Sequence, residues 1–98
     1  MHRTSKKNKK MKNKIQEIEK CIKMHDNNIP MKHSIIGCTS SVKSYIGGII
    51  DVYTKKTLQT TNLLLEICKK NQDTNYQIEV LYNGANEAYK IIIKELHL

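Results

Sequence analysis

The sequence predicts an all-α fold: a small three- to four-helix bundle or helical hairpin with a disordered basic N-terminal arm. Three observations support this prediction. Apolar residues recur at alternating steps of three and four in the last quarter of the chain, and a second such stripe begins near residue 11. Both patterns are typical of amphipathic helices. Seven basic residues also occur before residue 15 without an acidic residue among them, which is typical of a solvated segment.

The length of 98 residues predicts one small domain, which we divide into a disordered basic arm at residues 1–10 and a helical domain at 11–98. Only 39% of the residues are hydrophobic, and neither Phe nor Trp occurs. The core must therefore be built from Ile, Leu, Val, Met and Tyr. Because such a core gives a small monomer a modest margin of stability, we expect self-association.

The N-terminal arm is rich in Lys and Asn, and its apolar content is too low to offset the entropy lost on ordering. Of the formal net charge of +8, seven charges come from the first fourteen residues. This asymmetry predicts an arm that contacts nucleic acid or another acidic polymer. The alternatives are a solubilising tail or an upstream start in front of Met11. The candidate polyanion contacts are Arg3, Lys6, Lys7, Lys9, Lys10, Lys12 and Lys14.

The first predicted helix begins at Met11 and ends at residues 26–28, where Asp and Asn precede Pro30. Its apolar stripe covers fewer than three heptads, which favours a bundle helix over a free-standing coiled coil. The residues of this stripe are Met11, Ile15, Ile18, Ile22, His25 and Ile29.

Residues 31–56 are ambiguous between helix and strand. Ser40 or Ser41 could cap a helix, although Gly47 and Gly48 would each cost about 1 kcal/mol inside it. The β-branched run at 49–54 could instead form a strand. We predict a helix here, because both flanking regions read as helical and a single strand would have no partner.

The last two predicted helices are separated by a polar break at residues 71–73. The first begins at Thr57 or Thr60 and ends at Lys70, where positive charge suits the C-terminal end of the helix dipole. The second begins with a capping box at Thr74–Gln77 and continues to the end of the chain. A turn-type dipeptide, Asn83-Gly84, could kink or split this last helix.

The predicted packing face combines the stripes of the first and last helices. Stripe spacing alone does not distinguish burial inside one monomer from burial across an oligomer. The residues of this face are Ile15, Ile18, Ile22, Ile78, Leu81, Tyr82, Ala85, Ala88, Tyr89, Ile92 and Leu96.

The compartment is predicted from the cysteines and from the absence of targeting patterns. Three Cys without a close pair indicate reduced thiols rather than a disulfide scaffold. No apolar run approaches the ~18 residues of a membrane span, and the basic N-terminus lacks the apolar region of a secretory signal. We therefore expect a cytoplasmic protein without a signal peptide or transmembrane segment.

The sequence favours a non-enzymatic assembly module with no catalytic, cofactor-binding or metal site, whose partner is itself or another helical protein. Cys21 and His25 stand at i and i+4, but a zinc site needs two further ligands, and none has suitable spacing. The alternative is a small helix-turn-helix-like DNA-binding regulator that uses residues 36–46, where Gly37 would allow the turn and Lys43 would face the DNA.

Overall fold

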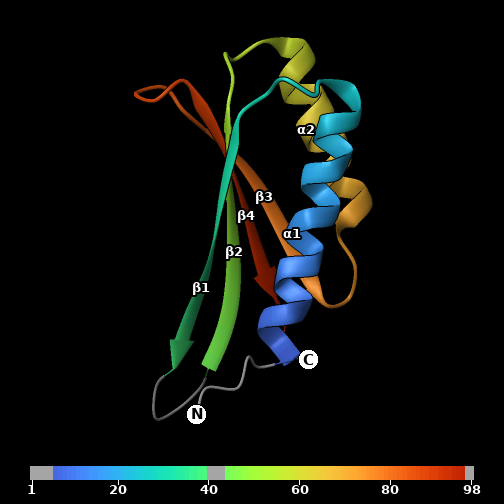
Figure 1. Ribbon diagram of the computed structural model, residues 1–98, viewed down its shortest axis with the longest axis vertical. Coiled ribbons are helices and arrows are strands. Elements are labelled where there is room, and N and C mark those ends of the chain that lie inside the picture. The colour runs from blue at the N-terminus through green and yellow to red at the C-terminus, as the bar shows by residue number, and fades with distance from the viewer. Residues whose placement is uncertain (1–5, 40–43, 97–98) are drawn as a thin grey trace.

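A computed structural model describes residues 6–39 and 44–96, and it overturns the all-α prediction. The described chain forms two helices and a four-stranded antiparallel sheet in the order α-β-β-α-β-β (Figure 1). It is therefore a mixed α/β domain and not a helical bundle. The elements are α1 (Lys6–His25), β1 (Met31–Thr39), β2 (Ser44–Tyr53), α2 (Leu58–Asn71), β3 (Tyr76–Asn83) and β4 (Ala88–Glu95).

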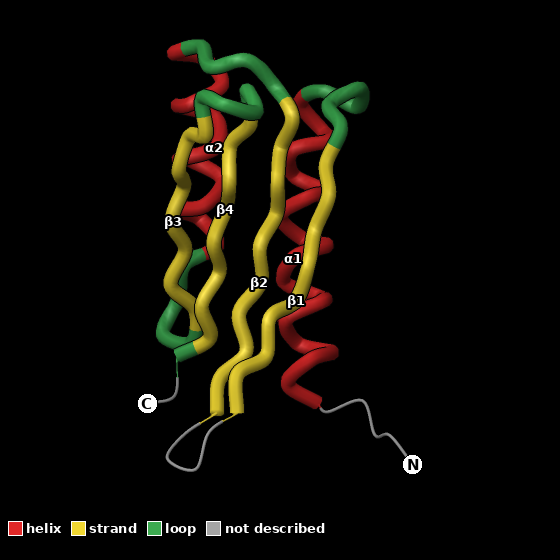
Figure 2. Tube along the Cα trace, turned by 90° about the vertical axis from the view of Figure 1, so that its left-hand side faces the viewer, coloured by secondary structure: helices red, strands yellow, loops and turns green. Residues whose placement is uncertain are grey.

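The sheet has the order β1-β2-β4-β3, and each pair of neighbouring strands is antiparallel. Both helices cover the same face, α1 over the β1–β2 hairpin and α2 over the β3–β4 hairpin (Figure 2). The described chain thus consists of two α-β-β halves. Because the central strands β2 and β4 run antiparallel, an approximate two-fold axis normal to the sheet relates the halves.

The last quarter of the chain forms the β3–β4 hairpin, where the sequence analysis predicted a helix. Ile78 pairs with Ile93 and Val80 with Ile91, so alternate residues of both strands face the helices. The Asn83 Oδ1 atom accepts a hydrogen bond from the backbone N–H of Ala85 at 3.1 Å and shapes the turn. The apolar residues of this segment fit both the steps of three and four of a helix and the alternation of a strand. The prediction was wrong because the segment adopts the strand.

The segment 44–53 is also a strand rather than the predicted helix. Its β-branched run is paired on both sides, by β1 and by β4, so the partners that the sequence did not reveal are present. Gly48 lies beneath α1, and a Cβ atom built on it would be only 2.8 Å from Ile15 Cδ1 and from Met11 Sδ. The glycine therefore allows α1 to approach the sheet closely.

The two predicted helices that remain are confirmed as α1 and α2, with one change of boundary. α1 begins at Lys6, so residues 6–10, which were assigned to a disordered arm, belong to this helix. α2 is capped as its sequence suggests: the hydroxyl oxygen of Thr57 accepts a hydrogen bond from the backbone N–H of Thr60 at 3.0 Å. Neither helix in the described part of the chain is long and apolar enough to cross a membrane.

The core lies between the two layers and contains buried residues of every element except β1, whose half-buried Met31 and Ile35 pack against it. The phenol of Tyr89, only 2% exposed, lies 2.7 Å from the hydroxyl oxygen of Thr61 and joins β4 to α2. Thr61 already donates its proton to the carbonyl of Thr57, so Tyr89 is the donor in this pair. The buried core residues are Met11, Ile15, Ile18, Ile22, Ile50, Val52, Leu64, Ile67, Cys68, Ile78, Tyr89, Ile91 and Ile93.

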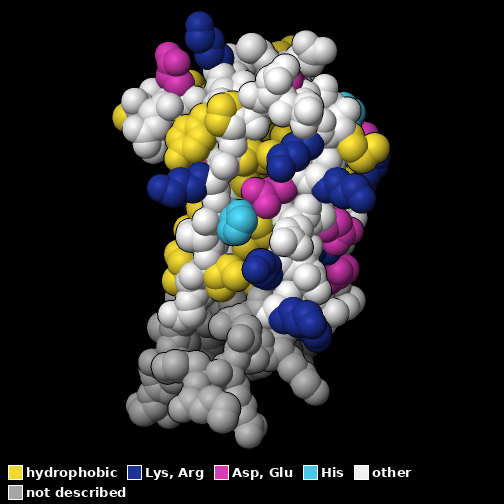
Figure 3. All heavy atoms as spheres, viewed as in Figure 1, with side chains coloured by type: hydrophobic (Ala, Val, Ile, Leu, Met, Phe, Trp, Pro, Cys, Tyr) yellow, Lys and Arg dark blue, Asp and Glu magenta, His cyan; other side chains and the backbone are white. Residues whose placement is uncertain are grey.

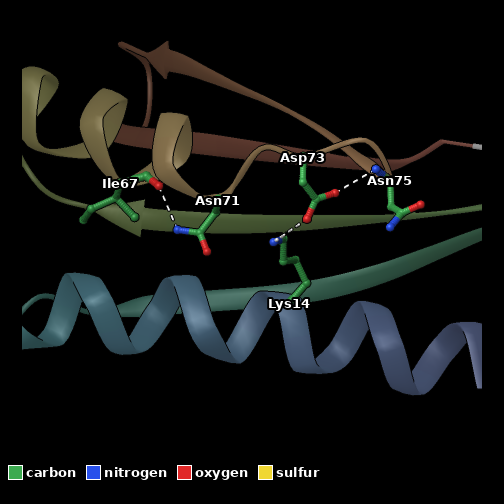
Figure 4. Close-up of polar contacts among 5 residues, drawn as sticks. All are labelled: Lys14, Ile67, Asn71, Asp73 and Asn75. Atoms are coloured by element: carbon green, nitrogen blue, oxygen red, sulfur yellow. Dashed lines mark hydrogen bonds and ion pairs between the residues drawn. The ribbon is translucent and has the colours of Figure 1, made fainter.

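Polar contacts attach α1 to the connection between α2 and β3 (Figure 4). The Lys14 ammonium lies 3.6 Å from Asp73 Oδ2 and 4.8 Å from the centre of the Tyr76 ring. The backbone N–H of Asn75 donates to Asp73 Oδ1 at 2.7 Å, and this bond is the main reason why the pKa of Asp73 is lowered, with Lys14 contributing further. On α2, the Asn71 side-chain amide donates to the Ile67 carbonyl at 2.8 Å.

Candidate interaction surfaces

The open face of the sheet is the face that neither helix of the described chain covers, and its strands lie in front of the helices in Figure 2. Because side chains alternate along a strand, the residues beside the core positions point to this face. The residues of the open face are Lys32, Ser34, Ile36, Ile49, Asp51, Tyr53, Gln77, Glu79, Leu81, Ala88, Lys90, Ile92 and Lys94.

The centre of the open face is apolar. Ile49 and Ile92 are directly opposite each other on the two central strands, and both are half-buried. Around them, Ile36 is 44% exposed, Leu81 50% and Tyr53 41%. The solvated face of a one-sided antiparallel sheet is normally polar, so these five side chains depart from the usual alternation.

Charges of both signs surround this apolar centre. The Lys94 ammonium lies 3.5 Å from Glu79 Oε1 on the neighbouring strand. One row across the sheet places Asp51 between Lys32 and Lys90. The open face therefore presents three lysines and two carboxylates and has no uniform charge.

Two hollows of the described surface lie beside titratable side chains. The one on the open face, beside Asp51 and Lys90, has a volume of about 110 Å³. A larger one, of about 340 Å³, lies between the end of α1 and the start of α2 and contains His25 and Asp26. Among the described residues, no three His, Cys, Asp or Glu side chains are placed to hold a metal ion.

The predicted packing face is divided between the two sides of the sheet. Leu81 and Ile92 belong to the open face, while Tyr82 stacks edge-on against the Tyr89 ring, with 5.1 Å between ring centres. Ala85 is exposed in the β3–β4 turn, and Leu96 is half-buried beyond β4. Ala88 also belongs to the open face by its register, although it is buried. The remaining members of the packing face are buried in the core of this one chain: Ile15, Ile18, Ile22, Ile78 and Tyr89.

The predicted polyanion contacts also separate. Lys9, Lys10 and Lys12 are exposed on α1, whereas the side chain of Lys14 is only 10% exposed and is held by Asp73. Arg3 lies outside the described residues, as do the side chains of Lys6 and Lys7.

The sequence analysis did not include Lys20 and Lys23, which are exposed further along α1. Their spacing from Lys9 and Lys12 places all four lysines on the same side of a helix. This spacing could have identified Lys20 and Lys23 as further candidate polyanion contacts. In Figure 3, basic side chains occur at several heights along the helical side of the molecule, with carboxylates between them.

The helix-turn-helix alternative concerns residues that the structure places in strands. It needs a recognition helix at 36–46, but residues 36–39 belong to β1 and 44–46 to β2, while 40–43 lie outside the described residues. On β1, the Nδ1 atom of His33 lies 3.3 Å from Glu19 Oε2 on α1.

Comparison with protein-family models, with curated proteins and with solved structures finds no match for this chain.

Proposed function

We propose that this domain is a non-enzymatic assembly module that pairs with a second copy of itself through the open face. The observation that carries the proposal is the apolar centre of that face, where Ile49 and Ile92 lie side by side among the exposed Ile36, Leu81 and Tyr53. Exposed apolar side chains grouped on one face of a small protein are typical of an interaction site.

The helices are not the favoured place for this contact, because their apolar stripes are already covered. Ile15, Ile18 and Ile22 have no exposed surface in the single chain. The stripe on α1, which suggested an oligomer from sequence, therefore contributes to the stability of the monomer. Of the large hydrophobic side chains that stay exposed, Ile36, Tyr53 and Leu81 lie on the open face. Met24 on α1 and Leu58 and Leu65 on α2 are also exposed.

The dimensions and charges of the open face suit a second copy. Four strands about 4.8 Å apart and about eight residues long span roughly 500 Å², so that two copies would bury on the order of 1,000 Å², close to the lower limit of specific interfaces. Face-to-face packing of two sheets is a common architecture. Since each copy carries lysines and carboxylates, a symmetric pair can place opposite charges against each other.

The test compares two Leu→Glu variants by sedimentation equilibrium from micromolar to millimolar concentration. Leu81 is 50% exposed on the open face, and Leu65 is 49% exposed on α2. We expect the natural chain to dimerise and Leu81→Glu to raise the dimer dissociation constant at least tenfold, because a carboxylate would be buried in the interface. Leu65→Glu is the matched control and should leave the constant within about twofold.

Two results would contradict the proposal. The first is a natural chain that stays monomeric over the whole concentration range. The second is a dimer that both substitutions weaken equally, which would place the contact elsewhere. Circular dichroism of both variants establishes that the fold is retained, and the Glu introduced at position 81 lies opposite Lys90, which favours its acceptance by the monomer.

A further inference from the structure

The solvent side of α1 carries a row of positive charges that the assembly proposal does not use. It lies opposite the buried stripe that begins at Met11 and ends at Ile22. Steps of three or four residues join five of its members, and Asn13 lies beside Lys12, so all six share one side of the helix. We call this row the basic ridge, and its members are Lys9, Lys12, Asn13, Gln16, Lys20 and Lys23, all exposed.

The two acidic residues of α1 point away from the basic ridge. Glu19 faces the sheet, where its carboxylate lies 3.3 Å from His33 Nδ1, and its side chain is 14% exposed. Glu17 lies on the other flank, where it lines a hollow together with Tyr76 and Glu95. The ridge itself therefore carries lysines and neutral amides, and the two carboxylates of α1 lie on its flanks.

The four ridge lysines form no ion pair with any carboxylate among the residues that the structure describes. This differs from Lys14 on the same helix, which is paired with Asp73. Like charges three or four residues apart disfavour a helix, and Lys9, in the first turn, opposes the helix dipole. An anionic partner would remove both effects.

We propose that the basic ridge binds the phosphate backbone of duplex DNA without reading its bases. The ridge spans about 21 Å, enough to reach several phosphates. Lysine acts as a point charge, and the Asn13 and Gln16 amides add hydrogen-bond donors of the kind that contact phosphate. The ridge has no aromatic side chain that could stack on a single-stranded base.

An anionic membrane is the less favoured partner for the same ridge. Helices that bind at a membrane surface insert an apolar face between the headgroups. The apolar face of α1 is fully covered by the sheet and by α2, which leaves only Met24 as a large exposed apolar side chain on this helix. A membrane could therefore attract the ridge only through its charge.

The experiment measures fluorescence anisotropy of a labelled 20-base-pair DNA duplex with the full chain between 50 and 200 mM NaCl. The test variant carries Lys20→Gln and Lys23→Gln, at positions that lie beyond the predicted basic arm. The control variant carries Lys69→Gln and Lys70→Gln in the exposed last turn of α2. Both variants lose the same charge, so they separate the ridge from the net charge of the protein.

We expect the natural chain to bind the duplex with a strong salt dependence. The ridge variant should bind about tenfold more weakly at 100 mM NaCl, with a slope of log affinity against log salt that is shallower by about two. The control variant should stay within about twofold of the natural chain.

Equal losses in the two variants would overturn the proposal, because binding would then follow net charge alone. Absence of salt-dependent binding would also overturn it. The same titration with phosphatidylserine vesicles distinguishes the phosphate of a lipid headgroup from the phosphate of DNA. Binding to the vesicles without binding to the duplex would assign the ridge to a membrane surface instead.

Discussion

Cys68 illustrates how its position in the fold changes the chemistry of one side chain. It belongs to the apolar side of α2, where it is 3% exposed, and this burial raises the pKa of its thiol to about 12. Only a thiolate is a good nucleophile or metal ligand, so this cysteine remains unreactive at neutral pH. Its side chain fills part of the core.

The raised pKa of Cys68 predicts how stability changes in alkaline solution. The folded chain holds the thiol proton up to about pH 12, while the unfolded chain releases it near pH 9.0. The stabilisation is therefore complete below pH 9 and is lost as the pH rises toward 12, by at most about 1.4 kcal/mol per pH unit. Urea unfolding of the natural chain and of Cys68→Ala, at pH 8 and pH 10.5, measures the effect.

The difference in the free energy of unfolding between these two proteins should shrink as the pH rises. The comparison cancels the titration of lysines and tyrosines, which both proteins share. A difference that stays constant from pH 8 to pH 10.5 would show that the Cys68 thiol is accessible to solvent in the folded chain.

At the scale of elements, the sequence predicted the helices better than the strands. α1 and α2 each have one apolar period and clear end signals, namely Pro30 after α1 and the Thr57 cap before α2. β3 and β4 are short, and their apolar residues also fit steps of three and four. The turn signal at Asn83-Gly84 is visible in the sequence, but within a pattern of threes and fours it predicts a kink or a split of a helix rather than a hairpin.

The open face escaped prediction for a related reason. Which side of β2 faces solvent depends on pairing with β4, and the two strands are separated by the whole of α2. A local sequence pattern does not reveal which strands pair when they are far apart in the chain. Ile49 and Ile50 illustrate this, since adjacent isoleucines lie on opposite faces of the sheet and only Ile50 belongs to the core.

The contact between α1 and the sheet gives a prediction for the glycines of the first hairpin. A Cβ atom on Gly48 would press against Ile15 and Met11, whereas a Cβ atom on Gly37 would meet nothing within 4 Å. We expect Gly48→Ala to lower the free energy of unfolding by about 1–3 kcal/mol, because the core is overpacked. Gly37→Ala should be neutral or should stabilise by up to about 1 kcal/mol, because alanine restricts the unfolded chain.

Chemical denaturation of the two alanine variants checks this prediction. Both substitutions add one methyl group to the same hairpin, so they differ only in what the new methyl group meets. If Gly48→Ala were as stable as Gly37→Ala, α1 would not pack as closely on β2 as the structure indicates.

At the scale of the whole molecule, the two α-β-β halves share one core. Core residues of the first half, such as Ile50, pack in the same cluster as Tyr89 and Ile91 of the second half. The central pair β2–β4 joins the halves through backbone hydrogen bonds as well. The helices lie on the side opposite the open face, so a pair formed through that face would carry one basic ridge on each outer side and could bind duplex DNA at two places.

A shared core predicts one cooperative unfolding transition. Ile50 has no exposed surface and lies in the first half, so Ile50→Val should lower the free energy of unfolding by about 0.5–1.5 kcal/mol. Three of the five tyrosines, including the buried Tyr89, belong to β3 and β4 in the second half. Near-ultraviolet circular dichroism of tyrosine therefore reports mainly on that half, while the far-ultraviolet signal reports on the whole backbone.

We expect both signals to move together to lower denaturant concentration in Ile50→Val, because loss of packing in one half destabilises the other. Ile36→Val is the control: Ile36 is 44% exposed on the open face, and its substitution should change the midpoint little when measured at a concentration where the chain is monomeric. A tyrosine signal that kept its midpoint in Ile50→Val would mean that the halves unfold separately. The core between β2 and β4 would then not hold the domain together, and the open face would not be a single rigid surface able to receive a partner.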